Sequence, residues 1–212
     1  MRNRIITTTA AAAVTGALAL SGVAAPAGAC ASTPRSGNTS LAEVLAADGH
    51  HFDKKWGDFD ILDAAVATVL KEKPKSPVKI LTQGRKRVTA FLPTDAAFRA
   101  LVKSLTGNRP RSEKATFAAL TKIADVDTVE TVLLYHVVPG ATITRKQAAK
   151  ADGAALTTAQ GGTVTVSVKG RKVRLRDADP DAANPRIVAF DINKGNKQIG
   201  HAINRVLRPL DL

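Results

Sequence analysis

The arrangement of apolar and polar residues divides the chain into a helical first half and a strand-like second half. In the first half, apolar residues recur every three or four positions, a spacing that puts them on one face of an α-helix. The stop signals Gly49, Pro74 and Gly107 follow these apolar stripes and predict where helices end. The pattern predicts helices over residues 41–47, 61–73, 98–105, 117–123 and 129–136.

The second half alternates apolar and polar residues with the period of a β-strand. Segments 164–168 and 173–175 alternate strictly, and Gly170 lies between them as a turn residue. Two further β-rich segments cover residues 187–192 and 199–207. Helices followed by hairpins predict an α+β fold rather than a doubly wound sheet.

The first 29 residues have the three-part layout of a secretory signal peptide. Arg2 and Arg4 precede an uncharged, alanine-rich stretch at residues 5–20, and small residues lead to a cleavage position after Ala29. The apolar stretch is short for a membrane-spanning helix of about 20 residues. Cleavage leaves Cys30 first, either as an unpaired thiol or as a lipid anchor, because bacterial lipoproteins are cut just before a lipid-modified cysteine.

Composition and charge exclude some classes of protein. The chain has 31 Lys and Arg against 18 Asp and Glu, a formal net charge of +13. Its single Cys excludes an intramolecular disulfide framework, and its 4% aromatic content argues against a stacking platform for nucleic acid. We expect no nucleic-acid partner and no cofactor. The small, polar segment 30–39 predicts a tether, followed by one domain over residues 40–212.

Two motifs in the first half specify local structure. Val88–Phe98 (VTAFLPTDAAF) is a β-rich run that turns into a helix, with Thr94 placed as its cap and Asp95 in its first turn. Asp127 and Glu130, three residues apart, predict a capping box at the start of a later helix. These devices predict a fold and do not specify any chemistry.

At these residues the chain resembles the fasciclin (FAS1) domain family. The first signature of that family is similar to Thr89–Phe98, its central Tyr-His segment to Leu133–Gly140, and its closing signature to Gly200–Pro209. The three signatures occur in the family's order, and the resemblance covers residues 40–212. It implies an α+β wedge, in which a β-sandwich of antiparallel strands is flanked by helices. It also implies extracellular adhesion without catalysis.

The central signature contains two candidate binding residues, Tyr135 and His136, because in some animal members this region contributes to contacts with cell-surface receptors. His136 falls on the same apolar stripe as Val129, so we expect a buried imidazole that hydrogen-bonds across the core. Tyr135 lies on a neighbouring face, where packing of its ring and contact through its hydroxyl both stay open.

Basic residues concentrate in two stretches, 71–87 and 169–176, with net charges of +6 and +5. On a strand that buries alternate residues, the cations between them point outwards and repeat about every 6.6 Å, twice the strand rise. Such a row can follow an anionic glycan, a cell-wall polymer or a membrane surface, or it can simply keep a secreted protein soluble. The candidate binding residues of this row are Arg171, Lys172, Arg174 and Arg176.

Catalytic and metal-binding motifs are missing from the sequence. No Gly-x-Ser-x-Gly elbow, phosphate-binding loop or His-Glu-x-x-His spacing is present, so we expect neither catalytic residues nor a metal site. Residues 177–181 begin like a calcium loop, but Ala182 and Val188 occupy the positions where such a loop needs Gly and Glu. We interpret this stretch as an acidic turn.

The sequence therefore predicts a secreted, monomeric adhesion protein of bacterial type that contacts cell-surface or matrix proteins or anionic glycans. Two alternatives stay open: a surface antigen anchored through Cys30 without a specific ligand, and a hydrolase of glycans or lipids on the same scaffold. A deep pocket with converging carboxylates or histidines would favour the hydrolase.

Overall fold

The computed structural model describes residues 37–49 and 51–209, so the expected signal peptide and Cys30 lie outside the described residues. The α-helices are α1 (Leu41–Leu45), α2 (Asp60–Glu72), α3 (Asp95–Thr106), α4 (Glu113–Ile123), α5 (Val126–Tyr135) and α6 (Arg145–Ala148). Two 3₁₀ helices are η1 (Ala46–Asp48) and η2 (Pro77–Thr82). The strands are β1 (Val88–Pro93), β2 (Val137–Pro139), β3 (Ala155–Thr157), β4 (Thr163–Lys169), β5 (Lys172–Arg176), β6 (Ile187–Ile192) and β7 (Gln198–Ile203).

The strands form two sheets, and the predicted α+β fold with packed sheets and flanking helices is confirmed. One sheet has the strand order β2-β1-β7-β6 and the other the order β3-β4-β5. The strands β1 and β7 pair in parallel, whereas the other strand pairs are antiparallel. The expectation of antiparallel strands throughout is wrong for this central pair, because a long crossover and not a hairpin joins its strands.

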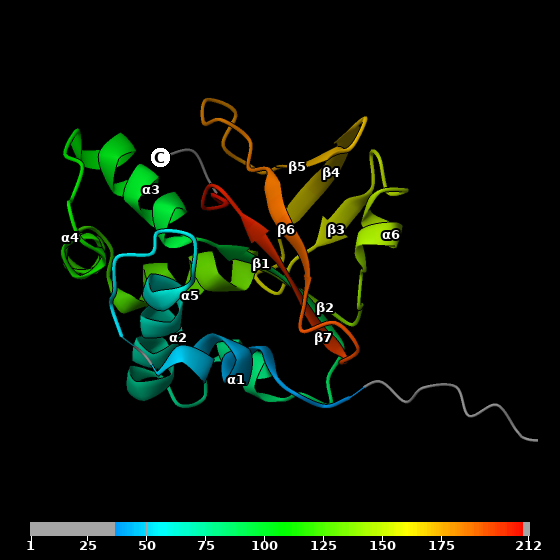
Figure 1. Cartoon of the computed structure of the whole chain (residues 1–212), viewed down its shortest axis with the longest axis horizontal. Coiled ribbons are helices and arrows are strands. Elements are labelled where there is room, and N and C mark those ends of the chain that lie inside the picture. The colour runs from blue at the N-terminus through cyan, green and yellow to red at the C-terminus, as the bar shows by residue number, and fades with distance from the viewer. Residues whose placement is uncertain (1–36, 50, 210–212) are drawn as a thin grey trace, which may run out of the picture. The chain divides into compact units, whose positions relative to one another are not determined.

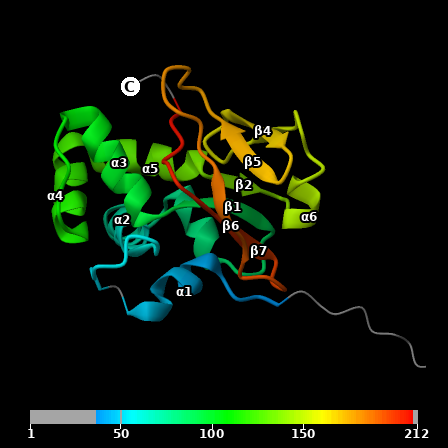
Figure 2. The same cartoon turned by 45° about the horizontal axis from the view of Figure 1, so that its top comes forward.

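Strand β1 separates two hydrophobic cores, because both of its faces are buried. Val88, Ala90 and Leu92 pack with the helices, and Phe91 packs with the three-stranded sheet. Figure 1 shows helices α1–α5 on one side of the four-stranded sheet and strands β3–β5 on the other. Figure 2 shows the same layers from a second direction. Phe91 and Phe98 are both buried, Phe98 in the helical core.

Several element boundaries differ from the prediction. The strand expected over 199–207 ends at Ile203, and the short elements η2, α6 and β3 were not predicted. The helix predicted over residues 61–73 begins one residue earlier, at Asp60, and its N-cap is Phe59. Leu105 and Ile123 belong to predicted apolar stripes, yet both are exposed at the last turns of their helices.

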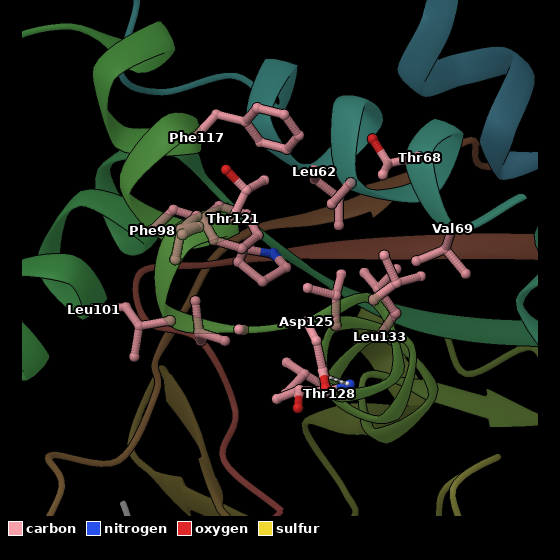
Figure 3. Close-up of a pocket in the computed structure, with 18 of the residues that line it drawn as sticks. Leu62, Thr68, Val69, Phe98, Leu101, Phe117, Thr121, Asp125, Thr128 and Leu133 are labelled. Carbon is pink, nitrogen blue, oxygen red and sulfur yellow. Dashed lines mark hydrogen bonds between the residues drawn. The ribbon is translucent and has the colours of Figure 1, made fainter. Parts of the chain in front are cut away.

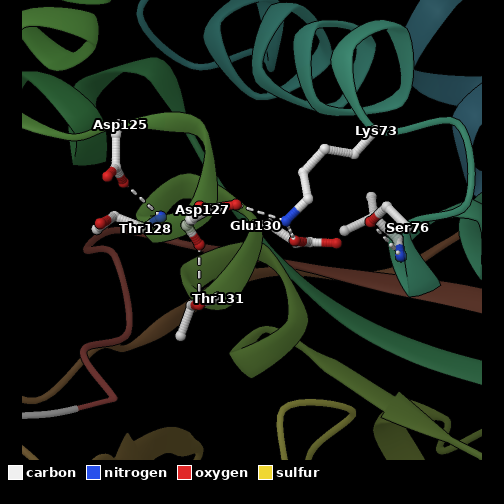
Figure 4. A network of polar contacts seen from close by, with 8 residues as sticks. Lys73, Ser76, Asp125, Asp127, Thr128, Glu130 and Thr131 are labelled. Carbon is white, nitrogen blue, oxygen red and sulfur yellow. Dashed lines mark hydrogen bonds and ion pairs between the residues drawn. The ribbon is translucent and has the colours of Figure 1, made fainter.

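The start of α5 also corrects the prediction. Asp125 is the N-cap, and its carboxylate accepts a hydrogen bond from the Thr128 N–H at 2.8 Å. Asp127 and Glu130 instead bind the ammonium group of Lys73 from the end of α2, with 2.6 Å between Lys73 Nζ and Asp127 Oδ1 (Figure 4). The hydrogen bond to Asp127 raises the pKa of Lys73 most, and the hydrogen bond to Glu130 raises it further. The expected capping box is therefore wrong, and its two acids join α5 to α2.

Candidate functional site

The two expected binding residues at the end of α5 are buried. Tyr135 is 1% exposed, and its hydroxyl donates a hydrogen bond to the carbonyl oxygen of Thr163 at 2.9 Å. Its ring packs in the core between the two sheets. Tyr135 offers no side-chain surface to a partner in this conformation, so of the two roles left open for it the structure favours packing over contact.

His136 connects α5 to the segment that follows β7. Its Nε2 atom accepts a hydrogen bond from the Leu207 N–H at 2.9 Å. The proton of the neutral ring is therefore on Nδ1, which lies 2.7 Å from the carbonyl oxygen of Val132. Burial lowers the pKa of His136 to about 4, and the Val132 carbonyl only partly opposes this shift. The expected core histidine is present, and both ring nitrogens are used inside the protein, so His136 cannot be a contact residue here.

The basic residues of strand β5 form an exposed row. Lys172, Arg174 and Arg176 are exposed and alternate with buried Val173 and Leu175. The predicted alternation is confirmed. Because alternate strand residues share a face, the three cations lie on one side of β5, about 6.6 Å apart along the strand.

Arg186, which the sequence analysis missed, extends this row sideways. It lies opposite Arg174 in an antiparallel bridge, and paired residues project to the same side of a sheet. Only the long-range strand pairing reveals this neighbour, since nothing in the local sequence connects the two residues. We call Lys172, Arg174, Arg176 and Arg186 the basic face. Among residues 37–49 and 51–209, no carboxylate forms an ion pair with any of its four cations.

The other expected basic residue, Arg171, lies in the turn between β4 and β5 and is exposed. Lys169 precedes this turn and pairs across the hairpin with Lys172. The basic face therefore continues through Lys169 into the hairpin end, and its two other partners on β4 are uncharged polar residues. These neighbours are Ser167, opposite Arg174, and Thr165, opposite Arg176.

A cavity of about 360 Å³ lies among four helices. Figure 3 shows side chains from α2, α3, α4 and α5 pointing into one space. Its size falls in the usual range for ligand pockets, about 300–1,000 Å³. The labelled lining residues are Leu62, Thr68, Val69, Phe98, Leu101, Phe117, Thr121, Asp125, Thr128 and Leu133.

The ionisable groups that line this cavity do not form a catalytic pair. They are Glu72, Asp125 and His136. The Asp125 carboxylate caps α5, and both His136 nitrogens are hydrogen-bonded inside the protein. Glu72 is exposed at the last turn of α2. The cavity can therefore receive an apolar group, but it has no free acid and base that converge on a bound molecule.

A cluster of carboxylates lies where three helices begin. Asp58 shortly precedes α2, Asp95 is the first residue of α3, and Glu113 is the first residue of α4. One oxygen from each lies within 4.8 Å of the others. Asp95 and Glu113 are 0% exposed, and Asp58 is half-buried. Asp53 and Asp60 form a second set with Asp58 under the same distance limit.

Only part of the negative charge in this cluster is compensated. Asp95 accepts hydrogen bonds from the N–H groups of Asp60, at 3.2 Å, and Ile61, at 2.9 Å, so it caps α2 from the start of α3. In contrast, Oδ1 of Asp58 and both carboxylate oxygens of Glu113 are buried without a hydrogen-bond partner. A buried, unpaired carboxylate is costly, and such groups usually bind a proton, a cation or water.

The pKa values reflect this environment. Burial, together with a hydrogen bond to the Asp58 carboxyl, raises the pKa of Asp95 to about 8, although the Ile61 N–H acts in the opposite direction. Burial also raises the pKa of Glu113 to about 7, and the charges of Asp58 and Asp60 add to this shift. The Asp53 N–H, whose hydrogen bond goes to Asp60 rather than to Glu113, is near enough to oppose the shift in part. Because Asp95 and Glu113 have no exposed surface, a substrate cannot reach them, and the cluster can hold a proton or a cation but cannot act on a substrate.

No sequence pattern predicts this cluster, because its members come from three distant segments. The only local signal was the density of acidic residues at 53–60, and Asp95 was interpreted as a helix-dipole residue. Residues 177–181, which begin like a calcium loop in sequence, fold as an acidic turn. In it, Asp179 accepts from the Ala182 N–H at 2.9 Å and pairs with Arg208 at 2.9 Å.

Comparison with known proteins decides the family. The Fasciclin domain family model matches residues 64–209, which is more than half of the chain. The chain belongs to the fasciclin family. A solved structure with the same fold is a FAS1 domain pair from the insect cell adhesion molecule fasciclin I, with 15% sequence identity and a TM-score of 0.53. The match covers 80% of this chain and 51% of that chain, so the chain spans about half of the domain pair. No curated protein matches the chain.

The predicted family and its α+β fold are thus confirmed. Fasciclin domains are generally adhesion modules rather than enzymes, and they are typically extracellular or on the cell surface. Across residues 37–49 and 51–209, no helix is long and apolar enough to cross a bilayer. The family therefore indicates a protein of the cell-adhesion type.

Proposed function

We propose that this fasciclin domain is a secreted, non-catalytic adhesion module that binds an anionic cell-surface or matrix polymer through its basic face. The observation that carries this proposal is the pairing of Arg174 with Arg186. Like charges directly opposite each other destabilise a strand pair, and no described carboxylate neutralises these two. A polyanion bound across Arg174 and Arg186 would offset the repulsion between them, and both side chains would attract it.

The geometry favours an extended polymer over a single small anion. Lys172, Arg174 and Arg176 form a straight row on β5, with the repeat of about 6.6 Å that alternate strand residues give. A sulfated or phosphorylated glycan, or a teichoic-type cell-wall acid, carries charges in a comparable linear series. We infer that such a chain lies along β5, with Arg186 and Arg171 as contacts on its flanks.

Charge reversal tests this function. The variant with Lys172→Glu, Arg174→Glu and Arg176→Glu replaces three attractions by three repulsions on the same face. At about 0.2–1 kcal/mol for each exposed pair, we expect affinity for heparin or a teichoic acid to fall by roughly 3- to 150-fold. The measurement is salt-dependent retention and direct binding at two ionic strengths, because exposed ion pairs weaken as salt rises.

A matched control separates the basic face from net charge. The variant with Lys103→Glu, Lys114→Glu and Lys122→Glu makes the same charge change at exposed positions of α3 and α4. We expect its retention to stay close to that of the unmodified protein. Equal loss in both variants, or unchanged retention of the folded β5 variant, would remove the proposal.

The two alternative functions predict other results. A hydrolase needs converging acid and base groups, which neither the helical cavity nor the buried acidic cluster offers to a substrate. A surface antigen without a ligand would show no salt-sensitive binding in any variant. We propose export with cleavage after Ala29, and the mass of the exported protein distinguishes a diacylated Cys30 from a free thiol.

A further inference from the structure

We propose that Asp58, Asp95 and Glu113 form a binding site for Ca²⁺ at the point where α2, α3 and α4 begin. The site is separate from the basic face, so this inference does not depend on the proposed adhesion function. It concerns a metal site that the sequence analysis did not expect.

The spacing of the three carboxylates fits a shared ion. Oxygens that bind one calcium ion at about 2.3–2.6 Å lie at most about 5 Å from one another. The oxygens of Asp58, Asp95 and Glu113 lie within 4.8 Å of one another. Three segments that are distant in the chain thus place one oxygen each at the distance that a single ion requires.

The unpaired atoms indicate where the ion contacts the protein. Glu113 is fully buried, points into the cluster, and has no hydrogen-bond partner on either oxygen. Oδ1 of Asp58 is likewise buried without a partner. The N–H donors at the start of α2 satisfy only Asp95. The helix ends therefore leave Asp58 and Glu113 uncompensated, and a cation between them would supply the missing charge.

The donor set selects the class of metal. All three ligands are carboxylate oxygens, which hard cations prefer, whereas Zn²⁺ and Cu²⁺ favour nitrogen and sulfur ligands. Mg²⁺ loses water reluctantly and usually keeps several water ligands. Because two of the three carboxylates are fully buried, the site favours Ca²⁺ over Mg²⁺. Half-buried Asp58, with Asp53 beyond it, provides the route by which the ion enters.

The bound ion would connect the start of α4 to the starts of α2 and α3. Asp95 already joins α3 to α2 through the N–H groups of Asp60 and Ile61. The segment that contains Asp58 is already connected to α3, because the Asp95 N–H donates to the Asp58 carbonyl oxygen at 3.1 Å, and a calcium ion would add α4. We therefore expect calcium to stabilise the helical side of the domain.

The position of the chain's single tryptophan gives a direct assay. Trp56 lies two residues before Asp58, and its carbonyl oxygen accepts a hydrogen bond from the Ala96 N–H at 2.9 Å, next to Asp95. Tb³⁺ is the probe for the calcium site, and excitation of Trp56 should sensitise its emission. We expect saturable Tb³⁺ emission that Ca²⁺ displaces. Saturating Ca²⁺, at about 100 times its Kd, should raise the melting temperature by roughly 5–10 °C.

Variants locate the ion. Glu113→Gln and Asp58→Asn keep side-chain size and remove charge, and each should weaken Ca²⁺ binding by at least about tenfold. Asp95 is left unchanged because it caps α2. Asp181→Asn, an exposed residue of the acidic turn at 177–181, is the matched control and should bind like the unmodified protein. Circular dichroism verifies that each variant is folded.

Two outcomes would overturn the proposal. If the unmodified protein shows neither saturable Tb³⁺ emission nor a calcium-dependent melting temperature at millimolar Ca²⁺, the carboxylates hold protons. If Glu113→Gln and Asp58→Asn leave both readouts unchanged, any bound ion lies elsewhere. Loss of glycan retention in the basic-face variant has no bearing on either outcome.

Discussion

Among single residues, the two buried histidines act as neutral hydrogen-bonding bridges. His136 joins α5 to Leu207, and His201 accepts a hydrogen bond from the Asp191 N–H at 3.2 Å on Nδ1. The Nε2 atom of His201 lies 2.8 Å from the carbonyl oxygen of Ile143 and carries the ring proton. Burial lowers the pKa of both residues, so protonation of either ring opposes folding.

The pKa of His136 leads to a prediction about acid stability. The folded-state pKa of about 4 lies below the usual histidine pKa of 6.5, so the unfolded chain binds the proton first as pH falls. The stabilising contribution is complete above pH 6.5 and is lost as pH falls toward 4. Between pH 7 and pH 5 we expect the unfolding free energy to lose about 2 kcal/mol through this residue.

His136→Gln isolates this contribution, because other groups titrate in the same range. His201 acts in the same direction, whereas Asp95 and Glu113, whose pKa values are raised, act in the opposite direction. Urea unfolding of both proteins from pH 7 to pH 5 gives the difference in free energy at each pH. The variant should lack the His136 part of the slope. Parallel curves for the two proteins would contradict the assignment.

At the level of elements, local signals predicted most helices and the β4–β5 hairpin. Strict alternation at 164–168 and 173–175 specifies a face as well as a strand, and the row of cations follows from it. The start of α5 shows the limit of such signals. Asp125 and Asp127 are both residues that can cap a helix. In the structure Asp125 is the cap, whereas Asp127 contacts Lys73 from α2, and no local sequence pattern predicts this long-range contact.

Long-range pairing explains the remaining differences. Strands β1 and β7 are buried at every position, so neither has an alternation that could predict its partner or its direction. Their parallel pairing depends on the whole crossover between them. The same limit applies to the sites: the row on β5 is local and was predicted, whereas Arg186 and the Asp58–Asp95–Glu113 cluster require contacts between distant segments.

At the scale of the described domain, the buried side chain of Gln198 is a joint: it connects a late segment of the chain to two early ones through hydrogen bonds. Its Oε1 accepts a hydrogen bond from the Leu41 N–H at 2.8 Å, at the start of α1. Its Nε2 donates to the carbonyl oxygens of Ile80, at 2.7 Å, and Gln83, at 3.0 Å, at the end of η2. Strand β7 therefore holds both α1 and η2 through one fully buried amide.

Replacing Gln198 tests how far the domain depends on this joint. Gln198→Leu keeps a similar volume but leaves the buried Leu41 N–H without a partner, and it removes the side-chain hydrogen bonds to the Ile80 and Gln83 carbonyls, which keep their backbone donors. At about 1–3 kcal/mol for a buried group without a partner, we expect a loss of about 2–5 kcal/mol in unfolding free energy, measured by urea denaturation. Gln83→Leu makes the same chemical change at an exposed side chain and should shift stability by no more than about 0.5 kcal/mol. If the two variants lose equal stability, Gln198 does not act as the joint, and packing of apolar side chains alone holds α1 and η2 against β7.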